Sequence, residues 1–301
     1  MAAVGAVVLG LLIGSFNDPS LMVEPEKRGD YTVLAGDFHA HTRMSDGFVS
    51  PFDVPLIAQR EGLHVVGLTE HNWVYPGKMA AWFSDLIGGP IVVVGAELTR
   101  KDYHIILLGL TDELDWWAPL PDALDEAHAQ GAVAIAAHPA KFFWPALDPV
   151  IDKLDGVELM HPIALRGETP NGWKWTSFPA FRDRAAAQGK QLTAIASSDF
   201  HFFRALGTFR TLLFVTERSS KGVVDAIREG RTVVYDLTGK AYGDPAMIAL
   251  LEDAPITYPT KDRAYAHEGV LDLVGRTLAW LGLLGLIIAP RRRKHILVAA
   301  R

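Results

Sequence analysis

Histidine and carboxylate residues recur in this sequence directly after short apolar runs. The chain has eleven histidines and no cysteine, so a metal site in it has to be built from imidazole and carboxylate groups. The clearest local pattern is His39-Ala40-His41. At the end of a β-strand, side chains two residues apart point to the same side, so both imidazoles can reach one ion. Taken alone, the pattern fits an ordinary surface or core pair of histidines equally well.

Similar polar groups follow other apolar runs along the chain. They are Glu70-His71, Glu97, His138 and Asp199-Phe200-His201. A random scatter of histidines and acidic residues would seldom place so many of them at strand ends. Burying these ionisable groups together at one site would be strongly unfavourable unless cations compensated for the lost hydration. The pattern therefore predicts a metal cluster.

The elements that must position these residues alternate between strands and helices. Expected strands are 33–38, 65–68, 91–94, 104–110, 133–137, 156–160, 192–197, 211–215 and 233–235. Expected helices are 54–59, 124–130, 179–188 and 221–228, with glycines at 62, 131 and 230 ending three of them. This alternation favours an α/β architecture with a mainly parallel sheet, and seven or eight such units favour a closed or distorted barrel. Such barrels keep their chemistry just beyond the strand C-termini.

These motifs together resemble the polymerase and histidinol phosphatase (PHP) family of metal-dependent phosphoesterases. The segments that carry the resemblance are His39-Ala40-His41, Ser45-Asp46-Gly47, Thr69-Glu70-His71-Asn72, Glu97, His104, Ala137-His138-Pro139 and Ser198-Asp199-Phe200-His201. They occur in the order of the family over roughly residues 34–245. One departure is Glu70, where the family more often has aspartate, and we do not expect that residue to touch a metal ion.

The resemblance implies a distorted seven-stranded (β/α) TIM-like barrel that holds two or three divalent ions. Mn, Zn and Fe all suit imidazole and carboxylate ligands, so the identity of the metal stays open. By the family pattern, the first ion is held by His39, His41, Glu97 and Asp199, the second by Glu97, His104 and His138, and the third by Asp46, His71 and His201. The implied catalytic residues are Glu97, Asp199 and His201. His104 lies at a strand start, so a core histidine is the alternative there.

Other residues have weaker assignments. Candidate phosphate contacts are Arg43, Lys141 and Arg204, each close in sequence to a predicted ligand, with solvated loop charge as the alternative. The sequence leaves open whether the side chains of Glu158 and His161 approach the predicted metal cluster. The remaining histidines at 64, 128, 267 and 295 are expected on the surface.

The charge distribution bears on the partner. The formal net charge is −6, but residues 18–270 carry 23 basic against 34 acidic side chains, a net charge of −11. A surface that holds a long polyanion is normally basic, so we expect no nucleic acid polymer and instead a small-molecule phosphate ester. The expected reaction is hydrolysis of a phosphate mono- or diester by a metal-activated water. Alternatives are hydrolysis of an amide or lactone, and a membrane-tethered module that binds metal without turnover.

The two ends of the chain are apolar. Residues 1–17 carry no charge, and the apolar segment 271–290 runs into the basic residues 291–294. We therefore divide the chain into a hydrophobic leader or anchor with linker (1–29), a metal-dependent hydrolase domain (30–250), a linker (251–270) and a C-terminal transmembrane helix with a basic tail (271–301). This predicts a membrane-associated protein whose terminal helices contact lipid and whose catalytic domain faces the extracytoplasmic side. An amphipathic helix lying on the domain is the alternative for the C-terminus.

Overall fold

The computed structural model describes residues 2–17, 22–163, 174, 176–201, 205–252 and 270–288. Its strands are β1 (Glu26–Arg28), β2 (Tyr31–Asp37), β3 (Val65–Leu68), β4 (Ile91–Arg100), β5 (Tyr103–Leu108), β6 (Val133–Ala136), β7 (Gly156–Met160), β8 (Thr193–Ala196), β9 (Thr211–Val215), β10 (Thr232–Tyr235) and β11 (Ala241–Gly243). Its helices are α1 (Ala2–Asn17), α2 (Asp53–Arg60), α3 (Tyr75–Ile87), α4 (Leu120–Ala129), α5 (Trp144–Leu147), α6 (Ser177–Ala187), α7 (Ser220–Arg228), α8 (Pro245–Glu252) and α9 (Val270–Ile288), with 3₁₀ turns at Lys141–Phe143 and Asp148–Lys153.

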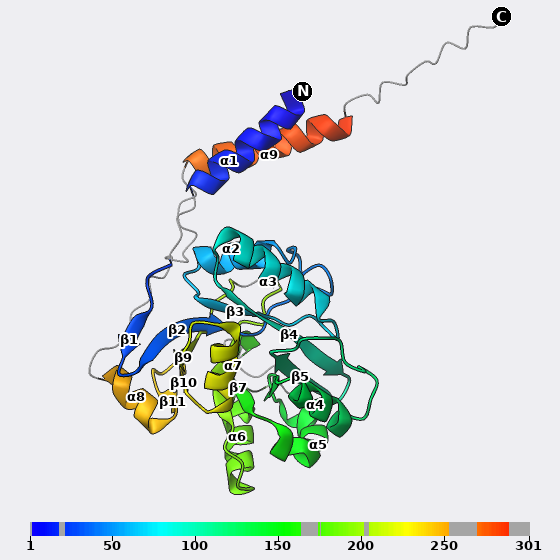
Figure 1. The fold of residues 1–301 in the computed structure, drawn as a ribbon. Helices are drawn as coiled ribbons and strands as arrows, with labels where there is room; N and C mark the ends of the chain where they lie inside the picture. The colour runs from blue at the N-terminus through cyan, green and yellow to red at the C-terminus, as the bar shows by residue number, and fades with distance from the viewer. Residues whose placement is uncertain are drawn as a thin grey trace, which may run out of the picture. The chain divides into compact units, whose positions relative to one another are not determined.

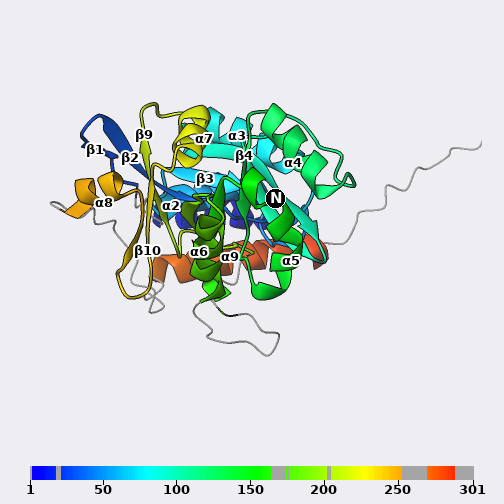
Figure 2. The ribbon, with the colours of Figure 1, turned by 90° about the horizontal axis from the view of Figure 1, so that it is seen from below.

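The strands form one curved sheet in the order β11-β10-β9-β2-β3-β4-β5-β6-β7-β8, and β1 pairs with β2. Helices lie around the outside of this sheet, with α3 against β4, α4 against β6 and α6 against β7 (Figures 1 and 2). The predicted α/β barrel is therefore confirmed as a nearly closed barrel-shaped sheet. Threonine side chains bridge the remaining gap. Thr211 Oγ1 bonds to both the N–H and the carbonyl of Ala196, and Thr232 Oγ1 donates to the carbonyl of Ala194.

The expectation of a mainly parallel sheet is wrong. Four of the strand pairs are parallel, namely β2/β3, β3/β4, β6/β7 and β7/β8. The others, including β4/β5, β5/β6 and β2/β9, are antiparallel. The reason lies in the connections, because only two residues, Lys101 and Asp102, separate β4 from β5. So short a link makes an antiparallel hairpin, whereas a parallel pair needs a crossover of a dozen residues or more.

Alternation along the strands produces two core layers. Ile106 and Leu108 of β5 pack with apolar side chains of other strands and of α7, whereas Ile105 and Leu107 pack with side chains that include Leu124 of α4. Successive strand residues point to opposite faces, so one strand serves both layers. The strands are consequently buried on both sides, as expected for a sheet covered by helices.

Glycines end the helices where the sequence predicted. Gly62, Gly131 and Gly230 follow α2, α4 and α7 with φ of 71°, 85° and 74°, a left-handed conformation that glycine adopts without steric cost. Helix α7 also begins as its sequence suggests, since the Ser219 hydroxyl accepts a hydrogen bond from Gly222 N at 3.0 Å. These local signals fix where each helix turns back toward the next strand.

The chain divides into two compact units, Leu21–Pro259 and a second one made of Met1–Ser20 with Thr260–Arg301. In the second unit, α1 and α9 pack closely through glycines. A Cβ on Gly10 would lie 2.5 Å from the carbonyl oxygen of Gly275, and one on Gly282 would lie 2.7 Å from that of Ala3. The finer boundaries at residues 30, 250 and 270 stay predictions.

The predicted membrane attachment is wrong. Among the described residues, no helix has the length and apolar character needed to cross a bilayer. Helix α1 has 16 residues, and α9 includes Asp272 and Arg276 within its 19 residues. A bilayer-spanning helix needs about 20 predominantly apolar residues. The predicted extracytoplasmic location and lipid contact depended on such spans and are withdrawn with them. The basic segment 291–294 lies outside the described residues.

His64 is a structural residue and not the surface residue expected. Its side chain is buried, its Nδ1 accepts a hydrogen bond from Ala35 N at 3.0 Å, and its Nε2 lies 2.7 Å from the carbonyl oxygen of Val23. The imidazole therefore joins the segment before β1 to β2. Burial lowers the pKa of His64 below its ordinary value of 6.5.

We predict that His64→Leu lowers the free energy of unfolding at pH 8 by roughly 1–3 kcal/mol, because two backbone groups lose their partner. Since the pKa of His64 is depressed in the folded state, the unfolded state binds the proton first, and the wild type loses stability as the pH falls below 6.5. Urea unfolding at several pH values measures both effects. The slope between pH 7 and 5 should be shallower for the variant, and equal slopes would contradict the assignment.

Candidate metal centre

The predicted ligands come together at one end of the sheet. His39 and His41 follow β2, His71 follows β3, Glu97 and His104 lie in β4 and β5, and His138, Asp199 and His201 follow β6 and β8. Two isolated bridges extend the sheet at this end, pairing Ala40 with Phe200 and His71 with Glu97. The bridges hold the loops after β2, β3 and β8 in register with their neighbours.

Glu97 is the centre of this arrangement. Its carboxylate is 1% exposed, and five imidazole nitrogens lie within 3.5 Å of it. These nitrogens are His39 Nε2 (3.5 Å), His41 Nε2 (3.5 Å), His71 Nδ1 (2.8 Å), His104 Nδ1 (2.8 Å) and His138 Nε2 (3.3 Å). Glu97 thus faces ligand-type groups from four segments of the chain, and it belongs to two of the groups of potential metal ligands.

Asp199 and Asp46 each face two of the predicted ligand histidines. Asp199 Oδ1 lies 3.3 Å from Nε2 of both His39 and His41. Asp46 Oδ2 lies 3.3 Å from His71 Nε2, and its Oδ1 lies 3.2 Å from His201 Nε2. Within each of the groups His39-His41-Glu97, Glu97-His104-His138 and His41-Asp46-His71-His201, the ligand atoms all lie within 4.8 Å of one another.

The donor set fits divalent metal binding. The Nε2 atoms of His39 and His41 are buried without a hydrogen-bond partner among the described residues. Buried polar nitrogens are normally paired, so unpaired ones aimed at a carboxylate suggest a missing ligand. His39 Nδ1 lies 3.0 Å from Glu158 Oε1 and donates to it, so the neutral ring has its lone pair on Nε2, facing the cluster. This carboxylate–histidine arrangement is common around protein metal ions.

Electrostatics keeps the carboxylates of the cluster ionised, but it favours the neutral, ligand form of His41 and the protonated form of His39, His71 and His201. Burial lowers the pKa of His41 to about 4, so its imidazole is neutral and has a lone pair to share. Burial opposes ionisation of Glu97, yet the neighbouring histidines hold its pKa well below the ordinary value. Burial acts to lower the pKa of His71, but hydrogen bonds to Asp46 and Glu97 outweigh it and raise the pKa to about 10. The metal-free cluster therefore retains protons that a bound cation would displace.

The backbone is strained at the cluster. Asn72, His138 and Asp199 have φ of 50°, 27° and 47°, and they are the non-glycine residues with positive φ in the described part of the chain. Such conformations cost roughly 1–3 kcal/mol each and persist where the surroundings over-determine them. Two of the three are predicted ligands and the third follows one, so the strain serves to aim these side chains.

Glu158 has an orienting role that the sequence left open. This fully buried carboxylate accepts from His39 Nδ1 and the Ser197 hydroxyl at Oε1, and from His138 N (2.6 Å) at Oε2. It therefore fixes the ring of one predicted ligand and the strained backbone of another. The only feature of the sequence that pointed to this role was a glutamate inside an otherwise apolar strand, three residues before a histidine.

Glu70 lies apart from the cluster, as the departure from the family pattern suggested. It is fully buried and accepts hydrogen bonds from the backbone N–H (2.9 Å) and hydroxyl of Thr42 and from the hydroxyl of Ser45. These bonds hold the loop that presents Asp46. Its role in the structure is to support that loop.

No contact in the described part of the structure supports the predicted phosphate-binding residues. Arg43 and Lys141 are exposed, and the Lys141 ammonium lies 5.8 Å from the centre of the Trp144 ring. Arg204 lies outside the described residues. The roles of all three stay predictions.

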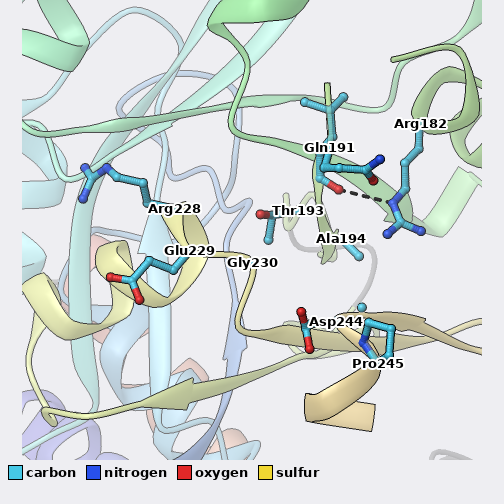
Figure 3. Close-up of a pocket in the computed structure, with 11 residues that line it drawn as sticks. Arg182, Gln191, Thr193, Ala194, Arg228, Glu229, Gly230, Asp244 and Pro245 are labelled. Atoms are coloured by element: carbon cyan, nitrogen blue, oxygen red, sulfur yellow. Dashed lines mark hydrogen bonds between the residues drawn. The ribbon is translucent and has the colours of Figure 1, made fainter. Parts of the chain in front are cut away.

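A cavity of about 570 Å³ lies elsewhere, at the start of β8 and beside α7 and β11 (Figure 3). None of the predicted ligands lines it. Figure 3 shows Arg228 turned away from Asp244, and its Nη2 donates to the carbonyl of Gly131 at 2.5 Å. Thr193 Oγ1 is likewise bonded, to the carbonyl of Ile227 at 2.8 Å. Arg228 and Thr193 are thus engaged with the backbone of the protein, and the predicted ligands lie elsewhere.

Comparisons with known proteins identify proteins to which this chain is similar. A family model described as PHP-associated matches residues 181–232. An uncharacterized protein of Methanocaldococcus jannaschii is 28% identical over 141 residues, which cover 42% of this chain and 82% of that one. A crystal structure from Bacteroides vulgatus, of a two-domain protein containing a predicted PHP-like metal-dependent phosphoesterase, has a TM-score of 0.56 at 24% identity and covers 71% of this chain and 68% of its own. That likeness shows a shared fold. A putative metal-dependent phosphoesterase from Bifidobacterium adolescentis has a TM-score of 0.44 at 18% identity, over 68% of this chain and 98% of its own.

We predict that Glu158→Gln weakens binding of divalent metal by about tenfold to a hundredfold, the usual effect of losing an orienting partner. The amide nitrogen of glutamine cannot accept a hydrogen bond, so the contact with either His39 Nδ1 or His138 N is lost. Competition with a chromophoric chelator measures the affinity. Glu252→Gln, at an exposed position in α8, is the matched control and should bind metal like the wild type. Equal affinity of both variants would contradict the role of Glu158.

Proposed function

We propose that this chain, which belongs to the PHP domain family, is a metal-dependent phosphoesterase that hydrolyses small-molecule phosphate mono- or diesters. The observation that carries the proposal is the convergence of three carboxylates and six histidines on one rim, with Glu97 at the centre. Hydrolysis of phosphate esters suits such a site because it needs concentrated positive charge and an activated water, and no side-chain nucleophile.

The proposed site holds two or three divalent ions. The first would be bound by His39, His41, Glu97 and Asp199, the second by Glu97, His104 and His138, and the third by Asp46, His71 and His201. When bound, such ions lower the pKa of a coordinated water toward neutrality and neutralise charge on a phosphoryl group. Nitrogen and carboxylate oxygen donors without thiolate suit Mn, Zn and Fe alike.

The residues of the chain have distinct tasks in this proposal. Glu97 and Asp199 supply the negative charge that retains the ions, and the burial of Glu97 keeps water from screening its charge. His201 Nδ1 donates to the carbonyl of Asp199 at 3.0 Å, so its Nε2 is free to bind. We therefore propose Glu97, Asp199 and His201 as the catalytic residues, with Glu158 keeping His39 in its binding tautomer.

The proposed partner is a small ester and no nucleic acid polymer. The net charge of −11 over residues 18–270 would repel a long polyanion. A single phosphate group can still enter, because the ions at the rim would outweigh the acidic surface locally.

We predict that the protein stripped with a chelator is inactive and that Mn, Zn or Fe restores hydrolysis of nitrophenyl phosphate mono- or diesters. Release of nitrophenol measures the activity, and an amide and a lactone of similar size are the control substrates. The proposal fails if the stripped protein keeps its activity or if the metal-loaded protein prefers the amide or the lactone.

We predict that Asp199→Ala lowers kcat/KM by at least about a thousandfold, because it removes a carboxylate that faces two predicted ligand histidines. Metal content measured on the same sample should fall as well. Asp122→Ala, at an exposed position in the first turn of α4, is the matched control and should retain both. Wild-type turnover by the Asp199 variant would show that the chemistry lies elsewhere.

A further inference from the structure

The histidines at the rim differ in the partner of the ring nitrogen that faces away from the cluster. His39 Nδ1 donates to the carboxylate of Glu158, and His201 Nδ1 donates to the carbonyl of Asp199. His71 differs, because its Nδ1 lies 2.8 Å from Glu97 Oε2 as well as 2.7 Å from Thr99 Oγ1, whose own proton goes to the carbonyl of Glu97. Both neighbours accept, so Nδ1 has the proton there too. When one of these rings is neutral, its single proton stays on Nδ1, and Nε2 presents a lone pair to the cluster.

His161 has the opposite arrangement. The backbone N–H of Ile163 donates to His161 Nδ1 at 3.2 Å. That nitrogen must therefore have the lone pair, which places the proton on Nε2. Nε2 lies 3.2 Å from Asp199 Oδ2 but has no well-aligned hydrogen bond to any described residue. His161 thus presents a buried N–H to the cluster, where the other rings present a lone pair.

Distance alone would make His161 a metal ligand. Its ligand atom lies within 4.8 Å of those of His39, His138 and Glu158. Two observations argue against an ion there. The Nε2 of His161 is protonated in the tautomer that Ile163 selects, and both oxygens of Glu158 already accept hydrogen bonds from His39, Ser197 and His138.

The position of His161 decides what its N–H can reach. The side chain is 6% exposed and lies just after β7, between the segments that follow β6 and β8. Its ring centre is 5.0 Å from that of His138 and 6.2 Å from that of His39. A buried N–H that is poorly aligned with its nearest acceptor, here Asp199 Oδ2, is unfavourable, so a ligand oxygen placed between these rings would satisfy it better.

We infer that His161 is a substrate-binding residue whose Nε2–H donates to a non-bridging oxygen of the phosphoryl group. The inference rests on the proposed function, because it assigns this N–H to the phosphate ester cleaved at the same rim. His161 adds a directional hydrogen bond to one oxygen of the anion, beside the attraction of the predicted ions.

Nuclear magnetic resonance of the full chain loaded with Zn²⁺ tests the tautomer directly. Two-bond ¹⁵N–¹H correlations report which ring nitrogen has the proton. We expect His161 to be protonated at Nε2 and His39 at Nδ1. A His161 ring protonated at Nδ1, with Nε2 bound to zinc, would overturn the inference without any variant being made.

Binding of inorganic phosphate to the metal-loaded full chain tests the contact. In His161→Asn, the side-chain oxygen can still accept from Ile163 N, but the donor at the position of Nε2 is removed. In His161→Gln, an amide N–H returns near that position. We expect calorimetry to show phosphate binding about tenfold or more weaker for the asparagine variant and within about threefold of the wild type for the glutamine variant. Metal content should equal that of the wild type in both.

Three results would overturn the inference. Loss of metal from His161→Asn would indicate that His161 binds a metal ion or holds Asp199 in place. If His161→Asn bound phosphate as tightly as the wild type, His161 would not contact the phosphoryl group. The same conclusion would follow if the metal-loaded wild type bound no phosphate. Failure of the proposed function is a separate result, namely no ester turnover by a wild-type protein that binds metal and phosphate, because the calorimetric comparison needs no turnover.

Discussion

A buried carboxylate surrounded by imidazoles is the constraint on which the rest of the structure depends. Glu97 is 1% exposed, and five histidines place a nitrogen within 3.5 Å of it. Protonating all of these rings would crowd like charges, since the His41 ring centre lies 4.4 Å from that of His71 and 4.3 Å from that of His201. Divalent cations would compensate the carboxylates with fewer, better-placed charges. The curved sheet brings side chains from several strands to one rim, where such ions could be held.

The geometry of the rim is maintained against local strain. His138 and Asp199 have left-handed backbones, which the chain adopts only where other contacts fix them. Glu158 accepts from the backbone N–H of His138, and the loop at Asp199 is held by two bonds between backbone groups, Phe200 N to His39 O and His41 N to Phe200 O. The same bonds orient the predicted ligands. Part of the stability gained from the two apolar core layers is therefore used to hold a conformation that only the site requires.

The sequence predicted the parts of this molecule that local chemistry specifies. Strands 65–68, 156–160 and 211–215 were predicted with the bounds that the structure has, because apolar runs between turn residues define them. Antiparallel pairing was missed, since it depends on the two-residue link between β4 and β5 and on which strands become neighbours. Helix α3 was missed for another reason. Its Trp82 and Leu86 are exposed, so the apolar residues do not follow a clean helical period. His64 looked like a surface residue because its partners, Ala35 and Val23, are distant in sequence.

The role of a histidine at this rim is decided at the nitrogen that faces away from it. His39 and His161 are both buried, both lie near Asp199 and both belong to one group of ligand-type atoms. Their residue type and distances do not separate them. What separates them is that His39 Nδ1 meets a carboxylate acceptor and His161 Nδ1 meets a backbone donor. A pattern of histidines in a sequence locates such a cluster, but the partners of the outer nitrogens determine which rings offer a lone pair to a cation and which offer a proton to an anion.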